Sequence, residues 1–151
     1  MADYKISDLT AYPNDYLQST DLIEVSYDDS GTFRSRKVTA DKIRPYKVYV
    51  ALLTQTSTNA PTATVLENTL GGTVVWSYSA TGQYLATLTG AFTSSKTAIY
   101  IQDGVKTGGG NYYVTASRVS ADVVAVYSSD NSFNGINGGI SNRTIEIRVY
   151  I

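Results

Sequence analysis

The chain has 151 residues and a net charge of −1, from 12 Lys and Arg against 13 Asp and Glu. The length suits one folded domain, and the near-neutral charge gives no reason to expect binding to nucleic acid or to an anionic membrane. The sequence has no His and no Cys, which excludes Ser-His-Asp and Cys-His catalysis, disulfides and the usual zinc sites. We therefore expect a protein that is not an enzyme and needs neither a cofactor nor a metal ion.

The first 46 residues differ in composition from the rest. Residues 1–47 hold 8 acidic and 7 basic side chains, whereas residues 48–151 hold only 5 of each. The opening 20 residues have few apolar side chains and no strand or helix periodicity, so we predict an extended arm that docks on another protein. The predicted docking residues are Tyr4, Ile6, Leu9, Tyr12 and Tyr16. The alternative is a disordered tail.

Residues 21–38 have the pattern of strand, turn and strand. Apolar residues from Leu22 to Tyr27 lead into Asp28-Asp29-Ser30-Gly31, where the glycine can adopt a positive φ, and the chain returns through Val38. This pattern predicts a β-hairpin. A single helical turn is expected at 39–43, capped by Thr39 and stopped before Pro45.

Residues 47–151 alternate short apolar runs with Gly, Asn, Asp and Ser, which predicts an antiparallel β-sandwich, jelly-roll-like or immunoglobulin-like. The expected strands lie near 47–55, 62–66, 73–79, 83–89, 97–102, 112–118, 122–128 and 143–151. We thus divide the chain into an attachment arm with hairpin, 1–46, and a sandwich domain, 47–151. No apolar run is long enough to span a membrane, so no membrane insertion is expected.

Alternation also predicts which side chains face the core. In the stretch from Leu70 to Ser79, Val74, Trp76 and Tyr78 share one strand face and should lie near Tyr84 of the following strand. In the last strand the apolar face is formed by Ile145, Ile147, Val149 and Ile151.

Two polar segments could serve as recognition loops. The Gly-rich stretch 104–113 lacks the Gly-Lys-Ser/Thr ending of a phosphate-binding loop and is interpreted as a hairpin loop. The stretch 130–142 is interpreted as a long exposed loop. Its Asp130, Ser132, Asn134 and Gly135 match the first half of a calcium loop, but Ser141 replaces the required Glu, so a plain turn is favoured.

The remaining candidates for chemistry are carboxylates and aromatic residues. A glycosidase would need two of the five domain acids at a set separation, but no motif links them, and we interpret them as surface charges: Glu67, Asp103, Asp122, Asp130 and Glu146. The 13 tyrosines are more informative, because Tyr suits protein interfaces and sugar-binding faces. The predicted ligand-facing residues are Tyr112, Tyr113, Asn131 and Asn134, with a host-surface glycan as the candidate ligand.

Several segments resemble tailed-bacteriophage virion proteins. The elements are Lys-Ile-Ser-Asp-Leu-Thr at 5–10, Asp-Leu-Ile-Glu-Val at 21–25, Lys-Val-Thr-Ala-Asp-Lys-Ile at 37–43, and Ala-Pro-Thr-Ala-Thr-Val-Leu-Glu-Asn-Thr-Leu-Gly-Gly at 60–72. The resemblance covers about two-thirds of the chain and none of its last third. It implies a non-enzymatic virion component, often multimeric.

Together these observations predict a virion structural protein made in the host cytoplasm. We expect a capsid-decorating or head-fibre protein attached to other virion proteins through its N-terminal arm, with the sandwich forming a homo-oligomer, a trimer being favoured. The alternatives are a tail or baseplate component, or a carbohydrate-binding adhesin domain that contacts the host surface.

Overall fold

The computed structural model describes residues 22–39, 43–105 and 111–151, and all of its regular structure is β-strand. The chain divides into two compact units, residues 1–44 and residues 45–151. The docking residues expected in the arm lie outside the described residues, and these are Tyr4, Ile6, Leu9, Tyr12 and Tyr16.

The first unit contains the predicted hairpin. Strands β1 (Leu22–Asp29) and β2 (Thr32–Thr39) pair antiparallel in register. Ser30 and Gly31 connect them with φ values of 54° and 88°, the two positive values that a type I′ turn requires. The Asp28 carboxylate accepts a hydrogen bond from the Gly31 N–H at 2.6 Å, which stabilises this turn. Thr39 is the last residue of β2, and the helical turn expected at 39–43 falls mainly on residues 40–42, which lie outside the described residues.

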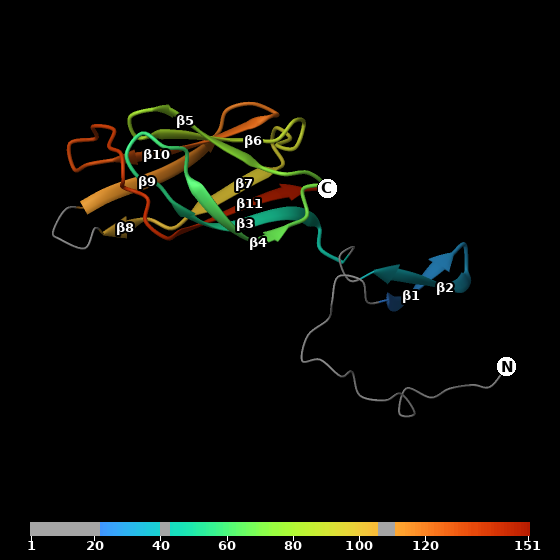
Figure 1. Ribbon diagram of the computed structural model, residues 1–151. Helices are drawn as coiled ribbons and strands as arrows, with labels where there is room; N and C mark the ends of the chain where they lie inside the picture. Colours follow the sequence, from blue (N-terminus) through green and yellow to red (C-terminus); the bar gives the residue numbers. More distant parts are fainter. Residues whose placement is uncertain (1–21, 40–42, 106–110) are drawn as a thin grey trace, which may run out of the picture. The chain divides into compact units, whose positions relative to one another are not determined.

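The second unit is an antiparallel β-sandwich, as predicted (Figure 1). One sheet has the order β5-β6-β10-β9-β8 and the other β4-β3-β11-β7. The strands are β3 (Tyr46–Thr54), β4 (Thr62–Asn68), β5 (Val75–Ala80), β6 (Gln83–Thr87), β7 (Thr97–Ile101), β8 (Gly104–Val105), β9 (Asn111–Arg118), β10 (Val123–Ser129) and β11 (Arg143–Tyr150). The short strand β8 was not expected, and it pairs antiparallel with β9, while the middle of the predicted hairpin loop lies outside the described residues.

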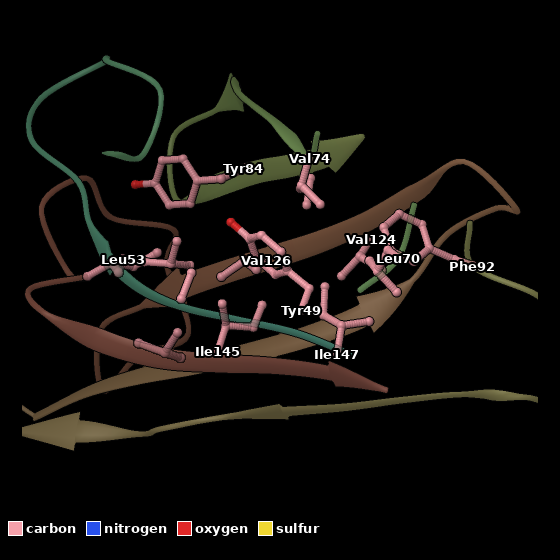
Figure 2. Close-up of a cluster of buried hydrophobic side chains, with 14 of the residues drawn as sticks. Tyr49, Leu53, Leu70, Val74, Tyr84, Phe92, Val124, Val126, Ile145 and Ile147 are labelled. Carbon is pink, nitrogen blue, oxygen red and sulfur yellow. The ribbon is translucent and has the colours of Figure 1, made fainter. Parts of the chain in front are cut away.

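The core lies between the two sheets and follows the alternation of the strands. On β3, Tyr49, Ala51 and Leu53 are buried, and β11 adds Ile145 and Ile147 from the same sheet. The facing sheet contributes a second set of buried side chains, shown in part in Figure 2: Tyr84, Ala86, Val114, Val124 and Val126. Successive side chains of a strand point to opposite faces of its sheet. The strand register therefore determines which side chains lie in the core and which lie on the outer surface.

The strand that holds Trp76 packs as expected. Val74 is buried in the core, and the half-buried Trp76 and Tyr78 pack against it. The Trp76 indole N–H donates to the Tyr49 hydroxyl at 3.1 Å, which links the two sheets. The Tyr78 and Tyr84 ring centroids lie 6.1 Å apart at an interplanar angle of 58°, so the predicted proximity of Tyr78 to Tyr84 is confirmed and the two rings are tilted rather than stacked.

Two expectations about the C-terminal third are wrong. Ile151 is 78% exposed, because β11 ends at Tyr150 and the alternation continues past the sheet. The stretch 130–142 is not simply an exposed loop, since Gly139 and Ile140 are buried and the Ile140 carbonyl accepts a hydrogen bond from the Gln55 N–H at 2.8 Å.

The buried tyrosines make the sandwich sensitive to alkali. Burial raises the pKa of Tyr49 and of Tyr84 above the ordinary 10.0. Unfolding lets both phenols ionise at their ordinary pKa, so their contribution to stability is complete below about pH 10 and is lost as pH rises toward the folded values. We expect the urea midpoint, followed by Trp76 fluorescence, to fall above about pH 10. Tyr49→Phe should make that fall shallower, and an unchanged pH profile in the variant would contradict the assignment.

Candidate functional site

The outer surface of the five-stranded sheet is uncharged across three rows of cross-strand neighbours. The rows are Val75, Thr87 and Val123; then Ser77, Leu85, Ala125 and Ser117; then Gln83, Tyr127 and Thr115. We call these residues the neutral face; Ala125, in its middle row, is itself buried. Val75 is 60% exposed and Tyr127 is 37% exposed, so the face offers apolar and aromatic area to a partner. Exposed apolar side chains on a surface without charged neighbours mark a candidate protein interface.

The outer surface of the four-stranded sheet is different, because charged side chains occupy its centre. Arg148 on β11 binds the Glu146 carboxylate, and its guanidinium lies over the rings of Tyr46 and Tyr100 at 4.8 and 5.2 Å. The Glu146 hydrogen bond, followed by that of Tyr150, raises the pKa of Arg148. Arg148 and Glu146 pair with each other, and Val48, the cross-strand neighbour of Arg148, is buried. We therefore interpret the Arg148 cluster as stabilising the fold rather than as binding a partner.

An aromatic pair lies beside the neutral face. Tyr113 on β9 stacks on Phe133, with ring centroids 5.8 Å apart and an interplanar angle of 18°. Phe133 is 80% exposed, the highest value among the large hydrophobic side chains described. An offset, nearly parallel arrangement is one that aromatic rings prefer, so Tyr113 fixes the orientation of the Phe133 ring.

The turn that carries Phe133 is tied together by Asp130. One Asp130 carboxylate oxygen accepts hydrogen bonds from the N–H groups of Ser132, at 2.8 Å, and Asn134, at 3.0 Å. The Asn134 N–H is the main cause that lowers the pKa of Asp130, and the Ser132 N–H adds to it. The Phe133 N–H donates to the Asp130 carbonyl at 3.0 Å. These bonds are those of an Asx-type turn, which supports the plain-turn interpretation over a calcium loop.

The base of the loop is fixed by close backbone packing. The Gly82 carbonyl accepts a hydrogen bond from the Ser128 N–H at 2.8 Å, and the Ser128 carbonyl accepts one from the Ile136 N–H at 3.0 Å. The Gly82 N–H donates to the Asn137 side chain at 3.1 Å. The aromatic pair is therefore carried by a loop with a well-defined attachment to the sheet.

The structure places the predicted ligand-facing residues as follows. Tyr113, Asn131 and Asn134 are exposed, and Tyr112 is half-buried. Asn131 and Asn134 flank Phe133 in one turn, so three of the four lie on or beside the aromatic pair. Phe133 itself was missed. Its signal in the sequence was an aromatic residue inside an otherwise polar Asn, Ser and Gly run.

The domain acids have structural partners. Asp103 accepts a hydrogen bond from the Val114 N–H at 3.1 Å, and Asp122 accepts one from the Gly90 N–H at 2.6 Å. Asp130 accepts hydrogen bonds within its own turn, and Glu146 forms an ion pair with Arg148. Within residues 22–39, 43–105 and 111–151, no three His, Cys, Asp or Glu side chains gather as a metal-binding group.

A pocket of about 340 Å³ opens at one end of the sandwich. Its apolar lining includes Leu70, Leu88 and Val149, and Lys47 and Lys96 also line it. The polar side chains that line the pocket are all exposed to solvent. The pocket therefore has no buried polar side chain that would orient a ligand. The pocket is therefore a weaker candidate for a binding site than the neutral face or the pair of Tyr113 and Phe133.

The part of the chain that the structure describes contains no helix of the length and hydropathy needed to cross a membrane. The chain matches no protein-family model, no curated protein and no solved structure. Its function is therefore inferred from its residues and their geometry.

Proposed function

We propose that the protein is a non-enzymatic virion structural protein, of the capsid-decorating or head-fibre kind, whose sandwich packs against neighbouring copies through the neutral face. The observation that carries the proposed self-association is the absence of charge from the three rows of that face, and the virion assignment rests on the resemblance of residues 5–10, 21–25, 37–43 and 60–72. A face without charge can meet a copy of itself or another neutral surface without like-charge repulsion and without burying an unpaired ion. The opposite sheet carries Arg148 and Glu146 at its centre and is less suited to this role.

The N-terminal unit is proposed to attach the protein to its particle. A two-stranded hairpin is at best marginally stable in water. One face of this hairpin places Ile23, Val25 and Tyr27 in a row, opposite Val38, Arg36 and Arg34. Packing this face on another virion protein would stabilise it, and the arm residues predicted from the sequence would extend the contact. The resemblance of residues 5–10, 21–25 and 37–43 to the start of phage virion proteins supports the same role.

A charge placed in the neutral face should break self-association. We expect the full chain to have a mass in solution that is a multiple of 16.3 kDa, a trimer being favoured, and the Val75→Glu and Tyr127→Glu variants to have the mass of one chain. The reason is that glutamate in a tightly packed neutral contact is desolvated without a partner. Light scattering after size exclusion measures this directly.

The matched control is Val65→Glu. Val65 is 51% exposed and lies on β4 of the other sheet, so the same substitution at similar exposure should leave the mass unchanged. A monomeric parent chain, or equal loss of association in the control, would contradict the proposed interface. The virion assignment has a separate test, which is quantitative mass spectrometry of purified particles. A structural protein is present in many copies per particle, and its absence from particles would refute the assignment.

A further inference from the structure

Phe133 is held in solvent by a backbone conformation that bulky residues avoid. Its φ is +61°, in the left-handed region where side chains other than those of Gly, Asn and Asp are uncommon. Its ring is nonetheless 80% exposed, so burial of the ring does not compensate for the conformation. Strained conformations of this kind cluster at binding sites, where the surrounding structure holds them.

The ring is pre-organised for contact with a ligand. The Asp130 carboxylate fixes the turn through the N–H groups of Ser132 and Asn134, and a bridge between Ser129 and Gly135 closes its base. The Tyr113 ring braces Phe133 from the sheet side. A ligand that stacks on Phe133 would therefore meet a side chain whose position is already set, which reduces the entropy lost on binding.

The groups around the ring select the chemistry of that ligand. Asn131, Ser132 and Asn134 are exposed polar side chains of the same turn, and none is basic. Among the described residues the Asn131 amide has no hydrogen-bond partner, so both its donors and its acceptor remain available. The Asp130 carboxylate is the charge in the turn, and the backbone N–H groups already engage it. An anionic ligand would find no positive partner in this turn.

We propose that the Phe133–Tyr113 pair and the Asn131 amide form a binding site for a neutral carbohydrate. The weakly polar C–H face of a pyranose ring stacks on an aromatic face, while its hydroxyls exchange hydrogen bonds with amides. This site does not include Val75 or Tyr127. A negative result for self-association would therefore leave the proposed carbohydrate site unaffected, and the reverse also holds.

The test is binding of the full chain to an array of neutral hexasaccharides of glucose, mannose, galactose and N-acetylglucosamine, with sulfated and sialylated glycans alongside. We expect a neutral hexasaccharide to bind, and Phe133→Ala to lower its affinity by about tenfold or more, measured by calorimetry. Tyr113→Ala should also weaken binding, whereas Phe133→Tyr and Tyr113→Phe should retain it. Tyr100→Ala, which removes an exposed tyrosine from the other sheet, is the matched control and should bind as the parent does.

A second variant separates binding from folding. Phe133→Gly removes the ring and relieves the positive φ, so we expect glycan binding to be lost while the urea midpoint stays equal or rises. Three results would overturn the proposal: no neutral glycan bound at millimolar concentration, equal binding by parent and Phe133→Ala, or a preference for sulfated glycans that Phe133→Ala does not change. A change in oligomer mass caused by Phe133→Ala without glycan binding would assign the ring to a protein contact instead.

Discussion

Replacing Gly82 by alanine is expected to destabilise the sandwich by about 3 kcal/mol or more. Gly82 has φ +70°, and a Cβ atom there would lie 2.3 Å from the Ser128 carbonyl oxygen, 2.6 Å from the Ile136 nitrogen and 2.7 Å from the Gly135 Cα. All three are backbone atoms, so no side chain can rotate away. Relief requires moving the 128–137 segment and lengthening the hydrogen bonds that hold it to Gly82. Urea unfolding followed by Trp76 fluorescence measures the change.

Gly90→Ala is the matched control for this substitution. Gly90 has φ +66°, nearly the value of Gly82, but a Cβ atom there would meet nothing within 4 Å. The control therefore carries the left-handed strain without the backbone clash, and we expect it to cost about 1–2 kcal/mol. Similar losses at the two positions would show that the contact between Gly82 and the 128–137 segment is not a tight one.

Most strands could be predicted because alternation is a local property of the sequence. Arg143 to Tyr150 places apolar residues at every second position, whereas Tyr46 to Thr54 is a short apolar run from Val48 to Leu53. The ends of both strands were predicted within one residue. Strand β8 could not be found this way. It has two residues and is defined by its pairing with β9, which no local pattern encodes.

The candidate surfaces depended on pairing between distant segments. The low charge of residues 48–151 was visible in the sequence, but only the register of β5, β6, β10 and β9 places Val75, Leu85 and Tyr127 on one side of a sheet. Phe133 was missed for the same reason, since its partner Tyr113 lies on another strand. The burial of Ile140 was hidden by the Asn and Gly residues around it, which form turns through backbone hydrogen bonds.

The second large effect is expected at Gln55, which is 2% exposed and lies directly after β3. Its Oε1 accepts hydrogen bonds from the Tyr84 hydroxyl at 2.8 Å and from the Gly138 N–H at 2.6 Å. Its Nε2 donates to the carbonyls of Ser57, at 2.6 Å, and Asn59, at 3.1 Å. One buried amide thus joins β6, the 134–140 segment and its own loop.

Gln55→Leu keeps the volume of this side chain but removes the acceptor of the buried Tyr84 hydroxyl and of the part-buried Gly138 N–H. Because an orphaned buried group costs about 1–3 kcal/mol, we expect a loss of about 2–4 kcal/mol in the free energy of unfolding. The Gly138 amide should also exchange with solvent faster than in the parent chain, because Gln55 is its acceptor.

Tyr84→Phe separates the amide from one of its contacts. It removes one donor to Gln55 and leaves the Gly138 bond in place, so we expect a smaller loss of about 1 kcal/mol. In the double variant the losses should be less than additive, because both changes remove the same hydrogen bond. A loss below 1 kcal/mol for Gln55→Leu, with unchanged exchange at Gly138, would mean that the 134–140 segment is held by its backbone contacts to Ser128 and Gly82 rather than by the buried amide.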